Sequence, residues 1–254
     1  MSDNHKHRAR IFLHRGDLVQ ARAAWEAAVA DDRTPGNQQA LSDSLGNLGN
    51  SCALMNDFPR AEQCYREVLQ IQRTEHNLTA VAHTLVNLGN LLIASDHPEK
   101  ARPYYLEAMD LLRQLQDHRG LGILYNNLAL QEAREGQWDQ AVASFKHALE
   151  HHRTVGNEEG LAVTYSQLGK CYLDQGDLTG AERCLNNASE HYIKLGNEPA
   201  EAAVLRLLSK VYETRQDHTA ARRCLERVVS LDQRYALPEL HTDSAHLSML
   251  SQSR

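Results

Sequence analysis

Asparagine side chains recur in this sequence at a spacing of 40 residues. Asn47, Asn87 and Asn127 share one position of the period, and Asn50 and Asn90 lie three residues after the first two. Asparagine is a poorer helix former than alanine, so three in register within a helical pattern need a reason. A side-chain amide carries both a donor and an acceptor, which matches a peptide group of any sequence. Two interpretations stay open: the amides are available to a ligand, or they bond to neighbouring helices and preceding carbonyls and hold the protein together.

Cationic side chains follow in the later periods of the same pattern. They are Arg134, Lys170, Arg206 and Lys210, whereas the earlier periods present amide and apolar side chains. A surface with amides at one end and cations at the other would suit an extended segment that ends in acidic residues or in a free carboxylate. The alternative is a set of ordinary solvated charges interleaved with acidic residues.

Motifs for catalysis and metal binding are absent from the sequence. It contains no G-x-x-x-x-G-K-[ST], no G-x-S-x-G and no H-E-x-x-H. His147, His151 and His152 could place two imidazoles on one helix face, but no acidic or cysteine partner stands at ligand spacing. We therefore expect solvated or inter-helix histidines, no metal, no cofactor and no catalytic residue, in a protein that is not an enzyme.

Composition narrows the class of protein and of partner. The chain has 254 residues, of which 42% are hydrophobic and 24% charged, and its net charge is −6. That charge argues against nucleic-acid binding, which normally needs a basic surface. No apolar run approaches the roughly 20 residues of a membrane helix, and the N-terminal residues carry no signal-peptide pattern. Five cysteines without a C-x-x-C pair fit a reducing compartment. We expect a cytoplasmic protein without membrane insertion.

The elements that position these side chains are helices arranged in a repeat. Alanine recurs six times at the 40-residue spacing, at Ala21, Ala61, Ala101, Ala141, Ala181 and Ala221. Within each unit, apolar residues recur at intervals of three and four, which predicts one buried helix face. Two breaks divide each unit. One is typified by Gly16-Asp17 and the other by Gly36-Asn37, where the first residue can adopt a left-handed conformation and the second can cap the next helix.

Two helices per unit predict an all-α protein of about six helical hairpins. The predicted units span residues 1–36, 37–76, 77–116, 117–156, 157–196 and 197–232. Because one hairpin cannot bury its own apolar face, the hairpins must stack on one another as a solenoid. Residues 233–254 leave the register and predict a short C-terminal capping helix and tail, with leucines covering the last unit. The alternative is a mobile segment that occupies the groove of a neighbouring molecule.

The residues of the repeat resemble a known family. Leu48, Gly49, Ala61, Tyr65 and Val68, repeated along the chain, resemble the tetratricopeptide repeat, a helix-turn-helix unit usually of 34 residues. The 40-residue form is similar to that of kinesin light chains, G-protein signalling modulators and bacterial peptide-sensing regulators. The resemblance implies a right-handed α-α superhelix whose first helices line a concave groove, with asparagines there holding the backbone of an extended peptide. The first unit departs from the pattern at Arg8-Ala9, and the last at Ser209.

This resemblance implies a function in protein binding. We expect a protein-interaction scaffold or adaptor, or an assembly factor, that binds a protein or an extended peptide in the groove. Its candidate site residues are Asn47, Asn50, Asn87, Asn90, Asn127, Arg134, Lys170, Arg206 and Lys210. The alternative is a peptide-sensing switch of the same repeat type. It is disfavoured because a chain filled by repeats leaves no room for an output domain.

Overall fold

A computed structural model describes residues 1–34 and 36–252. Over these residues the chain forms thirteen helices and no strand, which confirms the predicted all-α class. The helices are α1 (Ser2–His14), α2 (Leu18–Asp32), α3 (Gln38–Leu54), α4 (Phe58–Thr74), α5 (Leu78–Ala94), α6 (Pro98–Gln114), α7 (His118–Arg134), α8 (Trp138–Thr154), α9 (Glu158–Gln175), α10 (Leu178–Leu195), α11 (Glu198–Thr214), α12 (His218–Tyr235) and α13 (Leu240–Gln252).

A left-handed residue ends each of the first twelve helical segments at a spacing of 20 residues. The φ angles at these positions lie between 51° and 86°. Eleven of the positions coincide with the predicted breaks, and Ala236 is the one that the sequence pattern did not indicate. Seven helices are then capped by an Asp or Asn side chain that accepts a hydrogen bond from a backbone N–H of the first turn. The capping residues are Asp17, Asp57, Asn77, Asn157, Asp177, Asn197 and Asp217.

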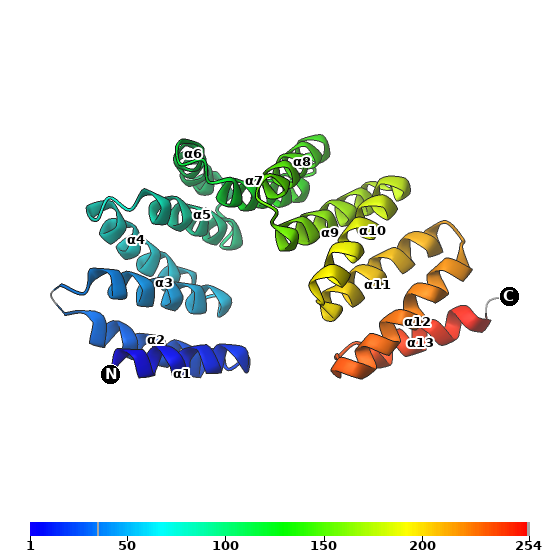
Figure 1. Cartoon of the computed structure of the whole chain (residues 1–254), viewed down its shortest axis with the longest axis horizontal. Helices are drawn as coiled ribbons and strands as arrows, with labels where there is room; N and C mark the ends of the chain where they lie inside the picture. The colour runs from blue at the N-terminus through cyan, green and yellow to red at the C-terminus, as the bar shows by residue number, and fades with distance from the viewer. Residues whose placement is uncertain (35, 253–254) are drawn as a thin grey trace. The chain divides into compact units, whose positions relative to one another are not determined.

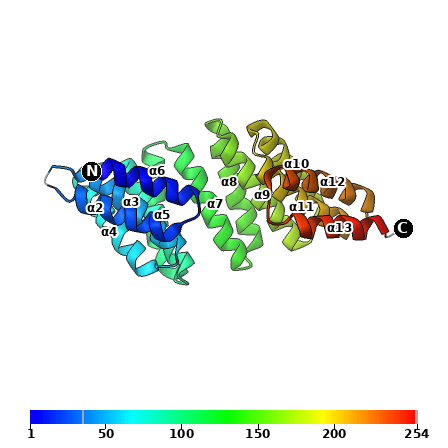
Figure 2. The ribbon, with the colours of Figure 1, turned by 90° about the horizontal axis from the view of Figure 1, so that it is seen from below.

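The helices form two compact units. In the N-terminal unit (Met1–Asp117), each helix from α1 to α6 packs against the next along the chain (Figure 1). In the C-terminal unit (His118–Arg254), α7 to α13 do the same, and α9 also contacts α7 and α11 (Figure 2). Within each unit the hairpins therefore stack consecutively, as the repeat predicts.

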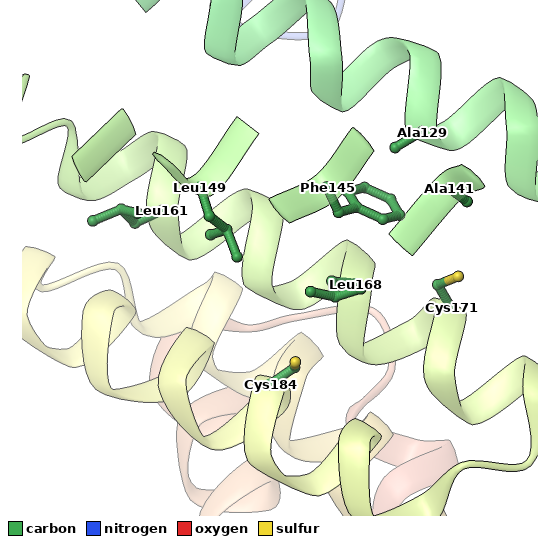
Figure 3. Close-up of a cluster of buried hydrophobic side chains, with 8 residues drawn as sticks. All are labelled: Ala129, Ala141, Phe145, Leu149, Leu161, Leu168, Cys171 and Cys184. Carbon is green, nitrogen blue, oxygen red and sulfur yellow. The ribbon is translucent and has the colours of Figure 1, made fainter. Parts of the chain in front are cut away.

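The repeat positions form the core. All six alanines of the 40-residue period are completely buried. Small residues on the first helix of a hairpin let a large side chain from the second helix approach closely: an ideal Cβ built on Gly89 would lie 2.4 Å from Cε1 of Tyr105. In the C-terminal unit, Figure 3 shows the ring of Phe145 directed towards Ala129 and Ala141, and these residues belong to one buried cluster.

The C-terminal helix α13 packs on α12, as predicted, but polar contacts dominate its attachment. The leucines expected to cover the last unit are only half-buried, whereas Asp243 is 7% exposed. Its carboxylate accepts a 2.6 Å hydrogen bond from Arg206 Nε, and Arg206 Nη2 bonds at 2.6 Å to Asp232, which is completely buried. The helix before it, α12, continues to Tyr235, past the predicted end of the array at 232.

Candidate functional site

The predicted asparagines differ in what they contact. Asn47 Nδ2 donates to the carbonyl oxygen of Asp43 at 2.7 Å, one turn earlier on the same helix. Asn87 is exposed and Asn127 half-buried, and neither hydrogen-bonds to another residue of the described chain through its side chain. Asn47 thus follows the structural interpretation of the column, while Asn87 and Asn127 keep both polar atoms available.

Asn50 and Asn90 are held by tyrosines from the second helix of the same hairpin. The Tyr65 hydroxyl donates to Asn50 Oδ1 at 2.6 Å, and the Tyr105 hydroxyl donates to Asn90 Oδ1 at 2.5 Å. Burial raises the pKa of Tyr65 to about 12, so its hydroxyl keeps its proton at neutral pH. Each bond occupies the amide oxygen and leaves the two N–H donors of the amide without a partner among the described residues.

The pairing of tyrosine with asparagine follows the repeat. Asparagine stands at this position of the first helix only in the two hairpins whose second helix supplies a tyrosine fifteen residues later. In the other four hairpins the second helix supplies a residue without this hydroxyl, and the first helix carries a residue other than asparagine. These pairs are Arg10 with Trp25, Leu130 with Phe145, Lys170 with Leu185, and Lys210 with Leu225. The hydroxyl therefore accounts for the asparagine at positions 50 and 90.

A pocket of about 390 Å³ in the N-terminal unit collects these amides. We call it the amide pocket. It lies between α3, α4 and α5 and is lined by Asn50, Ala53, Leu54, Phe58, Tyr65, Asn87, Asn90, Leu91 and Ala94. Three amides thus stand around an apolar floor, and Leu54 on that floor is 63% exposed. This combination can hydrogen-bond a peptide backbone and bury an apolar side chain of the same segment.

The predicted cations separate into two groups. Arg134, Lys170 and Lys210 are exposed and form no ion pair with another residue of the described chain. Lys170 on α9 and Lys210 on α11 occupy equivalent positions of two helices that contact each other. Arg206 is different, because its guanidinium already binds Asp232 and Asp243 and attaches α13. We therefore leave Arg206 out of the candidate binding surface.

The three neighbouring histidines of α8 do not act together. His151 stacks on Tyr125 with ring centroids 5.5 Å apart, and its Nδ1 lies 3.0 Å from Nδ1 of His118. His147 packs against the same tyrosine, whereas His152 points away and is 2% exposed. Among residues 1–34 and 36–252, no group of three His, Cys, Asp or Glu side chains could hold a metal ion.

Sequence reasoning expected amide and apolar side chains in these periods, but it missed the tyrosine hydroxyls and the particular residues that form the apolar floor of the amide pocket. The signal for the hydroxyls was present, since tyrosine and asparagine occur together in the same two hairpins. The floor residues Leu54, Phe58 and Leu91 come from the end of one helix, the start of the next and the last turn of a third. Only the packing of the hairpins brings these residues to one place.

Successive helical hairpins with a shared alanine and glycine packing column define a helical-repeat protein. The model of the tetratricopeptide repeat matches residues 3–74, 44–114, 78–154, 120–190 and 160–234. The chain therefore belongs to the tetratricopeptide repeat family. No curated protein matches it in sequence.

Solved structures share this fold. BtubC (BKLC) from P. vanneervenii is 20% identical with a TM-score of 0.76, and the match covers 87% of this chain and 92% of BtubC. PilW, a type IV pilus biogenesis factor, is 20% identical with a TM-score of 0.65, over 95% of this chain and 97% of PilW. A Rap protein complexed with Competence and Sporulation Factor is 14% identical with a TM-score of 0.69, and the match covers 98% of this chain and 74% of the Rap protein. At these identities the likeness concerns the fold alone.

Proposed function

We propose that this protein is a non-enzymatic scaffold or adaptor that binds an extended segment of a partner protein in the amide pocket. The observation that carries the proposal is the pair of tyrosine-anchored amides. Because Asn50 and Asn90 each give their oxygen to a tyrosine, they present N–H donors in a fixed direction. Such donors match the carbonyl groups of an extended backbone, and Asn87 supplies a further amide with both polar atoms free.

The C-terminal unit supports a preference for acidic partners. Lys170, Lys210 and Arg134 are exposed cations that form no ion pair with a described side chain. A segment with acidic residues or a free carboxylate would supply that charge, and exposed cations of this kind act on the rate of association and its salt dependence.

The setting that we propose is the cytoplasm. All five cysteines are unpaired, and four of them are buried, as expected in a reducing compartment. None of the helices in the described part of the chain is long and apolar enough to span a membrane. Two proteins of the same fold support the role: a Rap protein forms a complex with Competence and Sporulation Factor, and PilW is a pilus biogenesis factor. They favour ligand binding and assembly as functions for this chain.

The test is a selection of binders from a library of unstructured peptides, followed by affinity measurements on designed variants. Asn50→Asp and Asn90→Asp keep an oxygen for the tyrosine but remove the N–H donors. One net hydrogen bond contributes about 0.5–1.5 kcal/mol, so the double variant should bind a selected neutral peptide roughly tenfold more weakly or worse. Asn47→Asp is the matched control on α3, because Asn47 lies outside the pocket, and it should bind normally. Unchanged affinity in the double variant would refute the proposal.

A further inference from the structure

A second pocket, of about 300 Å³, lies in the C-terminal unit between α7, α8 and α9. We call it the His152 pocket. Three of its polar side chains are almost completely buried: Asn126 is 8% exposed, His152 2% and Thr164 1%. Polar groups buried to this extent nearly always have hydrogen-bond partners, because an unpaired one costs free energy.

The hydrogen bonds around His152 determine which of its nitrogens carries the proton. Asn157 Oδ1 accepts from the backbone N–H of Gly160, so its Nδ2 faces the ring and lies 3.1 Å from His152 Nδ1. Because that amide nitrogen is a donor, Nδ1 must be the acceptor of the imidazole. Burial lowers the pKa of His152, which keeps the ring neutral at neutral pH. Its Nε2–H is then a donor with no partner among the other described residues.

The other two buried groups also lack partners. Asn126 Oδ1 and Thr164 Oγ1 are both shielded from solvent, and neither has a hydrogen bond to a described residue. The equivalent hydroxyls of earlier repeats are paired: Ser44 donates to Asp32 at 2.7 Å, and Thr84 donates to Gln72 at 2.8 Å. Thr164 occupies the same register but bonds to nothing in the described chain.

The residues at the positions of Asn126 and His152 in the first and last hairpins give a second comparison. In the first hairpin this pair of positions holds Lys6 and Asp32, whose charged atoms are 2.9 Å apart. In the last hairpin it holds Arg206 and Asp232, 2.6 Å apart. The end hairpins therefore neutralise their polar pair internally. The fourth hairpin instead carries two uncharged polar side chains. Asn126 keeps an unpaired acceptor, Oδ1, and His152 keeps an unpaired donor, Nε2–H, among the described residues.

Two glycines form the space around the imidazole. An ideal Cβ on Gly122 or on Gly160 would lie 2.5 Å from an atom of the His152 ring, so neither position accommodates a side chain without movement. Ile123 and Val163, which are 46% and 36% exposed, form apolar walls at the opening. Arg119 and Glu159, both exposed, line the pocket as well. A group that enters would pass these side chains, and the Asn126 and Thr164 side chains would have to turn towards it for their shielded oxygens to accept hydrogen bonds.

We propose that the His152 pocket binds a primary carboxamide, as carried by a glutamine or asparagine side chain. The carboxamide oxygen would accept from His152 Nε2–H, and its N–H groups would donate to Asn126 Oδ1 and Thr164 Oγ1. A carboxylate offers no donor to Asn126 Oδ1, and an ammonium offers no acceptor to His152, so neither matches the three buried groups. Arg119 and Glu159 also line the pocket and bring one exposed charge of each sign, so the lining carries no net charge that favours either ion. Apolar walls suit the methylene groups that precede the amide. This site is independent of the amide pocket and does not rest on the peptide binding proposed for it.

The test is an NMR titration of the isotope-labelled full chain with blocked amino acids. N-acetylglutamine N-methylamide should shift the backbone amide signals of Gly122 and Gly160 saturably, and the matching glutamate and leucine compounds should bind at least fivefold more weakly. Titration with free L-glutamine separates the two sources of the carboxamide: binding as tight as that of the blocked compound assigns a free amino acid, and weaker binding assigns a side chain within a peptide. Equal shifts with all compounds, or none that saturate, would overturn the proposal.

Matched variants complete the test. Thr164→Val removes a hydroxyl that has no partner, so the free protein should be as stable as the wild type or more stable, while carboxamide binding weakens at least fivefold. Thr84→Val, at the equivalent position, should leave binding unchanged and lower the melting temperature, because it strands the Gln72 acceptor. Asn90→Asp should leave this binding unchanged as well, which separates it from the amide pocket. Full retention of carboxamide binding in Thr164→Val would contradict the assignment.

Discussion

Replacing Arg206 with alanine should release the C-terminal helix. Arg206 on α11 holds Asp232 of α12 and Asp243 of α13 through two hydrogen bonds of 2.6 Å. Asp232 is completely buried, and burial raises its pKa, with the neighbouring Asp243 carboxyl raising it further against the opposing effect of Arg206. The variant leaves these two carboxyls without their cation.

The size of the effect follows from the burial of the partners. Removing one member of a buried ion pair costs about 3–5 kcal/mol. The Arg206 side chain is itself 23% exposed, which places the loss at the lower end, about 3 kcal/mol. At about 1.4 kcal/mol per factor of ten, this corresponds to roughly a hundredfold rise in the opening of α13. The free energy lost in Arg206→Ala should become smaller as the pH falls, because protonation of Asp232 removes its uncompensated charge.

Hydrogen exchange followed by mass spectrometry measures this opening directly. Amides of α13 should exchange about a hundredfold faster in Arg206→Ala, while those of α7 and α8 stay protected. Lys210→Ala is the matched control, since it removes an exposed cation without an ion pair one turn later on the same helix. Equal protection of α13 in the wild type and in Arg206→Ala would refute the assignment of Arg206 to the attachment of this helix.

Four further substitutions test contacts elsewhere in the protein. Gly89→Ala should lower the free energy of unfolding by about 1–3 kcal/mol, because its Cβ would lie 2.4 Å from the Tyr105 ring; Gly46→Ala, with open space around its Cβ, should raise it by about 0.5–1 kcal/mol in thermal unfolding. Asn47→Ala should stabilise the protein slightly, since Asn47 bonds only to its own helix, and a clear loss of stability would show a contact between helices. Since the folded-state pKa of His152 is lowered, the unfolded chain binds this proton first, at a pH of about 6.5. Stability is therefore fully present above that pH and falls as the pH drops towards the folded-state value, and the melting temperature of His152→Gln should show less of this fall.

Local spacing was enough to predict the elements and much of the core. The alanines at 40-residue intervals are buried as expected, and the breaks at Gly16 and Gly36 adopt the left-handed backbone. These features depend on neighbours three and four residues away and on the turn chemistry of single residues, which a sequence displays directly. Ala236 carries no such signal, and its conformation accompanies the docking of α13 after it.

The site depended on contacts between helices, which spacing alone could not resolve. Asn47, Asn50 and Asn87 looked alike in sequence, yet one bonds to its own helix, one to a tyrosine and one to no described residue. Arg206 looked like a ligand-binding cation because its acidic partners lie 26 and 37 residues further along the chain. Side chains at such separations meet only after the hairpins have packed.

The central claim is that the amides of the N-terminal unit bind the backbone of a partner segment, and their own NMR signals report on it most directly. On titration with a selected peptide, the side-chain N–H signals of Asn50, Asn87 and Asn90 should shift downfield and saturate together with binding. The side-chain signals of Asn47 should stay in place, because its amide is already bonded to Asp43. A peptide that binds tightly while the three pocket amides keep their free-state shifts would contradict the account.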